Sequence, residues 1–109
     1  MTQEDKELLF KDLCARLPYR TMVKCITDYH HEFDEELSDI HIMNFYQFDT
    51  KPYLRPMSSM TEEEEEEYES IKCWKNEWDL VDWLNAHHFD FRNFIEKGLA
   101  LEAPEYMYK

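Results

Sequence analysis

The sequence predicts an α+β fold with an N-terminal helix, a small antiparallel sheet and C-terminal helices, all in a single domain over residues 1–109. Three observations support this prediction. Leucines recur at every fourth position near the N-terminus, at Leu9, Leu13 and Leu17. Two later segments are rich in β-branched and aromatic residues. In the second half, Thr61 and Asn76 each precede a helical pattern as capping residues.

The first helix is expected over residues 3–17. Thr2 caps it, and Asp5 follows three residues later in a short form of the capping box. Pro18 ends the helix, because the residue before a proline avoids helical backbone angles. A strand is expected next, over residues 20–28. Its apolar members are Met22, Val23, Cys25 and Ile26.

Residues 39–48 are the strongest strand candidate. Both alternating faces of this segment carry apolar residues, which indicates a central strand covered on both sides. We expect it to pair antiparallel with the strand over 20–28. The polar residues 28–38 are interpreted as a turn and a short or irregular segment. Residues 51–60 contain two prolines, which exclude a helix. The residues expected to anchor this segment to the core are Tyr53, Leu54, Met57 and Met60.

Two further helices are expected in the second half. Thr61 and Glu64 form a capping box for a helix that continues to about Lys72. Its inner face is expected to carry Tyr68, Ile71 and either Trp74 or Lys75. Asn76 caps the next helix, over residues 78–87. The apolar face of that helix consists of Leu80, Val81 and Leu84.

The C-terminal segment is expected to be partly helical. A fourth, short helix starts after Asp90 and carries Phe91, Phe94 and Ile95. Gly98 is the single glycine, and we expect it to end this helix in the left-handed conformation. Residues 99–103 are apolar enough to pack, and residues 104–109 are expected to fray.

Composition and charge restrict the class of protein. Hydrophobic residues make up 43% of the 109, which is too many for a disordered chain. The formal net charge of −13 repels nucleic acids and anionic lipid surfaces, favours basic partners and also serves solubility. No apolar run approaches the ~20 residues of a membrane span. The N-terminus lacks the pattern of a signal peptide, so we expect a cytoplasmic protein.

Cysteines and histidines form no recognisable catalytic or metal-binding motif. The three cysteines are widely spaced and odd in number, which disfavours disulfides. Cys14 is expected to be packed, while Cys73 lies where it can be exposed. Cys25 and His41, on neighbouring predicted strands, would pair as zinc ligands, but no clear third ligand accompanies them. We therefore expect no cofactor and no enzymatic activity, and keep a small metal- or thiol-dependent enzyme as an alternative.

Six consecutive glutamates, Glu62 to Glu67, are the most conspicuous feature. Along a helix they place one charge per about 1.5 Å, close to the one per about 1.7 Å of duplex DNA. The side chains turn around the helix, however, so Glu62, Glu66 and Glu69 share one stripe while Glu63 and Glu67 share another. The run is interpreted either as a solvated helix start or as a surface for a basic partner.

Three tryptophans, Trp74, Trp78 and Trp83, lie within ten residues of one another. Most of them are expected in the core of so short a chain. Trp78 and Trp83 are five residues apart, so both cannot point straight inward from one helix. An exposed Trp78, with Tyr53 and Met57 nearby, would form a protein-binding patch. The alternative is that a partner helix covers both tryptophans.

Several blocks of the sequence resemble a known group of proteins. The block KPYLRPMSSMTEEE, residues 51–64, resembles a recurring block in small uncharacterised proteins of gut Bacteroidales phages and mobile elements. Residues 6–19 are similar to their N-terminal helix, and residues 82–90 and 95–104 are similar to their end blocks. The segment from about 20 to 49 departs from their pattern. The resemblance implies a cytoplasmic protein carried by a phage or mobile element, and brings no activity with it.

Together these observations predict a non-enzymatic interaction protein that binds another protein, either a basic protein or a second copy of itself. The alternative within the same class is a nucleic-acid mimic that occupies a basic site on a host protein. The candidate partner-binding residues are Glu62, Glu63, Glu66, Glu67, Tyr53 and Trp78. We expect no direct binding to nucleic acid or membrane, and either a monomer or a homodimer.

Overall fold

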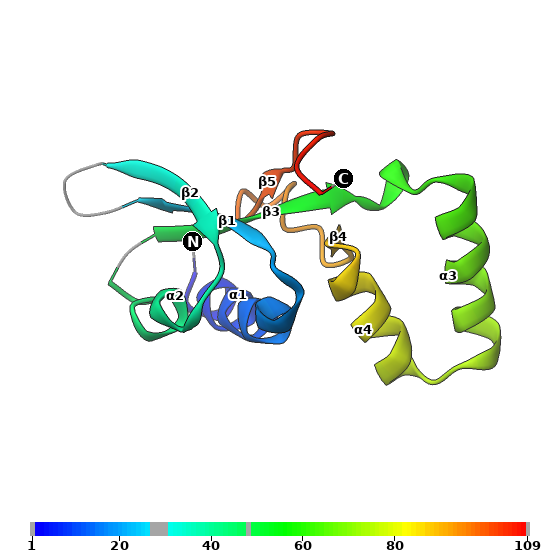
Figure 1. The fold of residues 1–109 in the computed structure, drawn as a ribbon. Coiled ribbons are helices and arrows are strands. Elements are labelled where there is room, and N and C mark those ends of the chain that lie inside the picture. The colour runs from blue at the N-terminus through cyan, green and yellow to red at the C-terminus, as the bar shows by residue number, and fades with distance from the viewer. Residues whose placement is uncertain (1, 27–30, 48, 109) are drawn as a thin grey trace.

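The computed structural model describes residues 2–26, 31–47 and 49–108 (Figure 1). Its helices and strands follow one another as α1 (Gln3–Arg16), β1 (Met22–Ile26), β2 (Glu32–Glu36), α2 (Asp39–Met43), β3 (Asp49–Pro56), α3 (Glu62–Trp74), α4 (Glu77–Ala86), β4 (Phe89–Asp90) and β5 (Leu101–Glu102). Single 3-10 turns cover Leu17–Tyr19 and Met57–Ser59. The predicted α+β class is confirmed.

The molecule is elongated. Its Cα radius of gyration is 14.2 Å and its extents are 46 × 28 × 24 Å, compared with a radius of about 13 Å for a rounded domain of this length. Figure 1 shows the reason, because α3 and α4 form an antiparallel hairpin that projects from one end of the sheet. At the other end, α1 and α2 lie together on one side of the sheet.

The sheet is mixed, whereas the sequence predicted an antiparallel one. The strand order is β2-β1-β3-β4, and β5 also pairs with β3. β1 pairs antiparallel with both β2 and β3, while β4 and β5 each pair parallel with β3. The two parallel strands follow the α3–α4 excursion, which returns the chain to β3 in the same direction.

The strand predicted over 39–48 is wrong. Residues Asp39–Met43 form α2, and turns continue to residue 47. Ser38 starts this helix through a capping box with His41. Leu37, His41 and Phe45 are buried at intervals of four residues, which is the helical period. The apolar residues on both alternating faces concealed this period, and Ile40 and Met43 are exposed.

The segment predicted as irregular, 28–38, contains β2, although residues 27–30 lie outside the described part of the chain. All five β2 residues are exposed, and the acidic ones are poor strand formers. Each of its carboxylates nevertheless meets a partner. Glu32 meets Lys24, Asp34 meets the Tyr53 hydroxyl, Glu35 meets His41 and Glu36 meets Arg20. These contacts, which come from other elements, explain why the local pattern did not reveal the strand.

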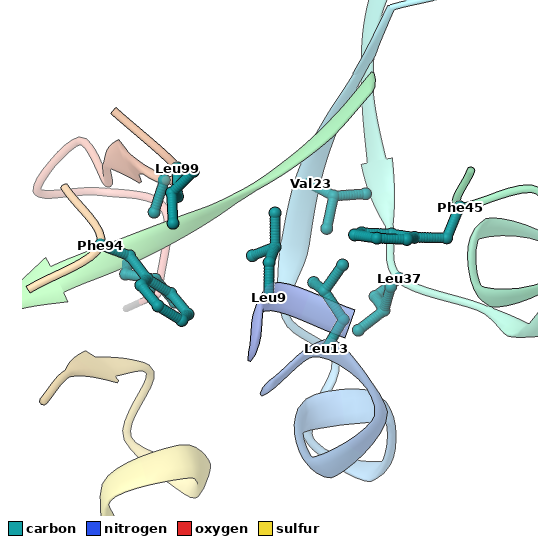
Figure 2. Close-up of a cluster of buried hydrophobic side chains, with 9 residues drawn as sticks. Leu9, Leu13, Val23, Leu37, Phe45, Phe94 and Leu99 are labelled. Carbon is teal, nitrogen blue, oxygen red and sulfur yellow. The ribbon is translucent and has the colours of Figure 1, made fainter. Parts of the chain in front are cut away.

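The core lies between α1 and the sheet. Leu9 and Leu13 of α1 are fully buried, as the leucine periodicity predicted, and pack against Val23 of β1 (Figure 2). The other members of this cluster are Leu37, Phe45, Leu54, Phe94, Leu99 and Ala100. β3 thus supplies Leu54 to the core while its prolines exclude an α-helix over residues 51–60.

A buried ion pair joins α1 to the C-terminal half. The Arg16 Nε donates to Asp12 Oδ2 at 2.8 Å, and both side chains are almost completely buried. The Arg16 Nη2 donates to the Phe89 carbonyl at 2.7 Å, and Arg92 reaches the second Asp12 oxygen at 3.2 Å. Because a buried charge is costly without partners, these contacts hold β4 against α1.

The fourth helix predicted after Asp90 does not form. Residues 91–98 are a series of turns or lack regular structure. The Asp90 carboxylate accepts from the amides of Phe94 and Ile95 at 2.8 and 3.0 Å, as a helix cap would. Asn93 then adopts a φ of 60°, which prevents a continuous helix. Gly98 has a φ of 77°, so its predicted left-handed conformation is confirmed.

The C-terminal tail, predicted to fray, is attached to the sheet. The Tyr108 hydroxyl accepts from the Met22 amide at 2.9 Å and donates to the Tyr53 carbonyl at 2.6 Å. The β1–β3 register aligns Val23 with Pro52, so Met22 and Tyr53 are the next pair in the ladder. The hydroxyl therefore bridges the two strands where their direct pairing stops.

Replacing Tyr108 by Phe removes both bonds and leaves a half-buried amide and a carbonyl unpaired. We expect Tyr108→Phe to lower the free energy of unfolding by about 1–3 kcal/mol, measured by urea denaturation. Tyr106→Phe is the matched control, because Tyr106 is 77% exposed. It should change stability by less than about 0.5 kcal/mol. If Tyr108→Phe and Tyr106→Phe changed the free energy of unfolding equally, the Tyr108 bridge would contribute nothing to stability.

Candidate functional site: a projecting acidic and aromatic hairpin

The α3–α4 hairpin begins at a half-buried ion pair. The Thr61 hydroxyl accepts from the Glu64 amide at 3.2 Å, and Glu64 accepts in return from the Thr61 amide, so the predicted capping box is confirmed. The Arg55 guanidinium donates to both Glu64 oxygens, at 2.8 and 2.7 Å. These bonds from Arg55 hold the pKa of the Glu64 carboxyl at about 2, against the cost of burial.

The same arginine connects both ends of the hairpin to the sheet. Arg55 donates to the carbonyls of Ser59 and His87, and its guanidinium lies 4.3 Å from the centre of the Phe89 ring. His87 ends α4 and places its Nδ1 3.2 Å from Glu64. The base of the hairpin is therefore fixed to β3 and β4, while its tip extends away from them (Figure 1).

Replacing Glu64 by Gln removes the charge that Arg55 pairs with. We expect Glu64→Gln to lower the free energy of unfolding by about 1–3 kcal/mol at pH 7, measured by urea denaturation. Because the folded pKa lies below that of the unfolded chain, this contribution is complete above the unfolded value of 4.5 and is lost as the pH falls toward 2. Glu65→Gln, at the exposed neighbouring position, should change stability by less than about 0.5 kcal/mol.

Trp83 packs inside the hairpin. Its ring lies 6.0 Å from Tyr68 of α3, 4.4 Å from His87 and 5.8 Å from Phe89, measured between centroids. Its indole Nε1 donates to Glu67 at 3.0 Å. Tyr68 and Ile71 are half-buried, as predicted for the inner face of α3. Trp83 thus holds α3 and α4 together near the sheet.

The outer surface of α3 is acidic. Glu62, Glu63, Glu66 and Glu67 are exposed, and so are Glu65 and Glu69. Among the described residues, none of these six carboxylates forms an ion pair, whereas Glu64 pairs with Arg55. Glu67 accepts a hydrogen bond from the indole of Trp83. The four candidate residues on α3 therefore differ in role, because Glu67 contacts Trp83 whereas Glu62, Glu63 and Glu66 do not.

Two tryptophans lie exposed at the tip. Trp74 ends α3 and is 84% exposed, while Trp78 lies in the first turn of α4 and is 80% exposed. The prediction that most tryptophans lie in the core is therefore wrong, and so is the alternative that a partner helix covers both Trp78 and Trp83. Only Trp83 is partly covered. Either Trp74 or Lys75 was expected on the inner face of α3, but both are exposed because the tip extends beyond the elements that would bury them.

Tyr53 does not belong to this surface. The sequence placed it beside Trp78 in a binding patch, but it is only 8% exposed and lies in β3. Its hydroxyl donates to Asp34 at 2.7 Å across the sheet. Its burial confirms the expectation that Tyr53 anchors residues 51–60 to the core, and shows that its assignment to an exposed patch is wrong.

The proposed cysteine–histidine pair does not assemble. Cys25 is buried in β1, and burial raises the pKa of its thiol. His41 lies on α2, where its ring contacts Ser38 and Glu35. Cys14, expected to be packed, is exposed, as is Cys73. Within residues 2–26, 31–47 and 49–108, no three metal-ligating side chains cluster.

His88 is a half-buried histidine with a structural position. It adopts a φ of 64°, stacks on Tyr108 at 3.8 Å between centroids, and lies 3.2 Å from the Thr21 hydroxyl. Burial lowers the pKa of His88 to about 4, and the positive charges of Arg16 and Arg55 add to this effect. The stack is therefore uncharged at neutral pH.

This depressed pKa makes folding depend on pH. Between about 4 and 6.5 the unfolded chain takes up a proton on His88 that the folded chain does not, so stability rises with pH across this window. We expect His88→Asn to reduce this slope, measured by urea denaturation at several pH values. Asparagine tolerates the left-handed backbone. His31→Asn, at an exposed histidine, should keep the wild-type slope.

No protein-family model, curated protein or solved structure matches this chain. Across the described residues, no helix combines the length and apolar character needed to cross a bilayer.

Proposed function

We propose that this protein is a non-enzymatic interaction protein that binds a basic protein surface through the α3–α4 hairpin. The exposure of Trp74 and Trp78 at the projecting tip, 84% and 80%, is the observation that carries the proposal. We further propose that it acts in the cytoplasm, for the phage or mobile element whose small proteins it resembles. Its partner would be a protein of the host or of that element.

The tryptophans supply affinity in this proposal. A buried aromatic side chain covers about 150–250 Å², and tryptophan is enriched among the residues that dominate binding energy. Burying both at the centre of an interface would release several kcal/mol at about 25 cal/mol per Å². Their position at the tip of a hairpin lets them enter a concave surface that a flat sheet would not reach.

The acidic face of α3 supplies charge complementarity. Its unpaired carboxylates lie between the base of the hairpin and Glu69, five residues before Trp74, so a basic partner that buries the tryptophans also faces negative charge along the same helix. Such charges raise the association rate and define the orientation of the partner more than they raise affinity. This division of roles favours a basic protein over a second copy of the same acidic chain.

A basic protein partner also fits better than nucleic-acid mimicry. The outward stripe of Glu62, Glu66 and Glu69 places three charges over about 10 Å of helix. Duplex DNA carries one charge per about 1.7 Å. One face of α3 therefore has roughly half the linear charge density of duplex DNA, or less. A groove that binds DNA would meet less negative charge on α3 than on its own ligand.

The test begins with capture of partners from host lysate by the tagged full-length chain, identified by mass spectrometry. Binding of the purified partner is then measured at low and high salt. We expect the double variant Trp74→Ala, Trp78→Ala to bind at least about tenfold more weakly at both salt concentrations. Tyr106→Ala, at an exposed aromatic residue outside the hairpin, should bind like the wild type.

The contribution of charge is tested with the triple variant Glu62→Gln, Glu66→Gln, Glu69→Gln. We expect slower association and a weaker salt dependence, with little change in dissociation. The control changes three exposed glutamates elsewhere, Glu4, Glu96 and Glu105. Binding that weakens at high salt but is unchanged by the tryptophan substitutions would favour nucleic-acid mimicry. Binding unaffected by either set of hairpin variants would refute the proposal.

A further inference from the structure

A cavity of about 370 Å³ lies at the opposite end of β3 from the hairpin. The parallel β3–β5 register aligns Tyr53 with Leu101. If this pairing continued toward the N-terminal ends of both strands, Lys51 would be aligned with Leu99. The ladder does not continue, because the Leu99 amide donates to the Phe94 carbonyl at 2.9 Å instead. Residues of α1 and Phe45, which follows α2, complete the lining.

Three lysines line this cavity, one from each of its walls. Lys6 comes from α1, Lys51 from β3 and Lys97 from the turn before β5. They are a quarter of the 12 basic residues in a chain whose net charge is −13. None of the three forms an ion pair with a carboxylate within the described part of the chain.

Two carboxylates at the cavity offset part of this charge. Asp5, which also contacts the Thr2 amide in the capping box of α1, and Asp49 both line the cavity. The three lysines and two aspartates leave the lining with a net charge of +1. This excess of positive charge selects for an anion.

The cavity is apolar where it meets the core. Leu9, Phe45 and Leu99 line it and are each at most 3% exposed (Figure 2). A volume of about 370 Å³ lies within the range of small-molecule sites, which combine apolar walls with a few polar groups. The lining therefore fits an anionic group attached to an apolar or aromatic body.

We infer that this cavity binds a small phosphate monoester, with the phosphate among Lys6, Lys51 and Lys97 and an apolar or aromatic body against Leu9, Phe45 and Leu99. Lysine suits phosphate because its ammonium group acts as a compact charge with three donors. The inference is independent of the hairpin, since it uses none of the same residues.

Phenyl phosphate is the probe, because it carries the two required parts and little else. We expect saturable binding to the full-length chain by calorimetry, with matching shifts in the amide NMR signals of residues 97–99. Inorganic phosphate lacks the ring and phenol lacks the charge, so each should bind at least about tenfold more weakly. Benzoate tests for a carboxylate ligand, and binding tighter than that of phenyl phosphate would overturn the phosphate assignment.

The lysines are tested one at a time by replacement with Met, which keeps the length of the side chain. We expect Lys6→Met, Lys51→Met and Lys97→Met each to weaken phenyl phosphate binding about five- to tenfold. Lys11→Met, at an exposed position of α1 away from the cavity, should leave it unchanged. Absence of saturable binding, or equal effects of Lys11 and the cavity lysines, would overturn the inference.

Discussion

β3 must satisfy its backbone hydrogen bonds with three different strands, and the rest of the structure depends on this constraint. Buried amides and carbonyls need partners, and β3 finds them in β1, β4, β5 and the Tyr108 hydroxyl. Pro52 and Pro56 lack an N–H, so the ladder is divided into short pieces. Each piece pairs with a segment from a different part of the chain. This pairing places the C-terminal third of the chain against its N-terminal half.

The position of the hairpin follows from the far end of β3. Arg55 lies one residue before the strand ends, and its contacts with Glu64, His87 and Phe89 fix both helices at their base. Among the residues that the structure describes, the tip has no comparable contact with the sheet. A rigid base and an unsupported tip together leave Trp74 and Trp78 in solvent, and this arrangement links the fold to the proposed binding function.

Two groups of charged residues lie at opposite ends of β3. The acidic hairpin follows its C-terminal end, and the lysine-lined cavity lies beside its N-terminal residues. Between them, charged and polar groups are buried in pairs, as in Asp12 with Arg16 and His88 with Thr21. Separating such a pair costs free energy because it leaves a buried polar or charged group without a partner. The pairs therefore fix the relative positions of their elements more firmly than a small apolar core alone would.

The sequence by itself determined the elements that local interactions form. The capping boxes at Thr2 and Thr61 and the cap at Asn76 fixed the starts of α1, α3 and α4, because each bond spans only a few residues. The tertiary structure alone decided β2 and the attachment of the tail, since their partners lie elsewhere in the chain. α2 has a local capping box, Ser38 with His41, but apolar residues on both alternating faces of the segment concealed the helix. The tertiary structure also decided which aromatic residues are exposed. Burial depends on what a helix packs against, and no local pattern shows that the hairpin tip extends past the sheet.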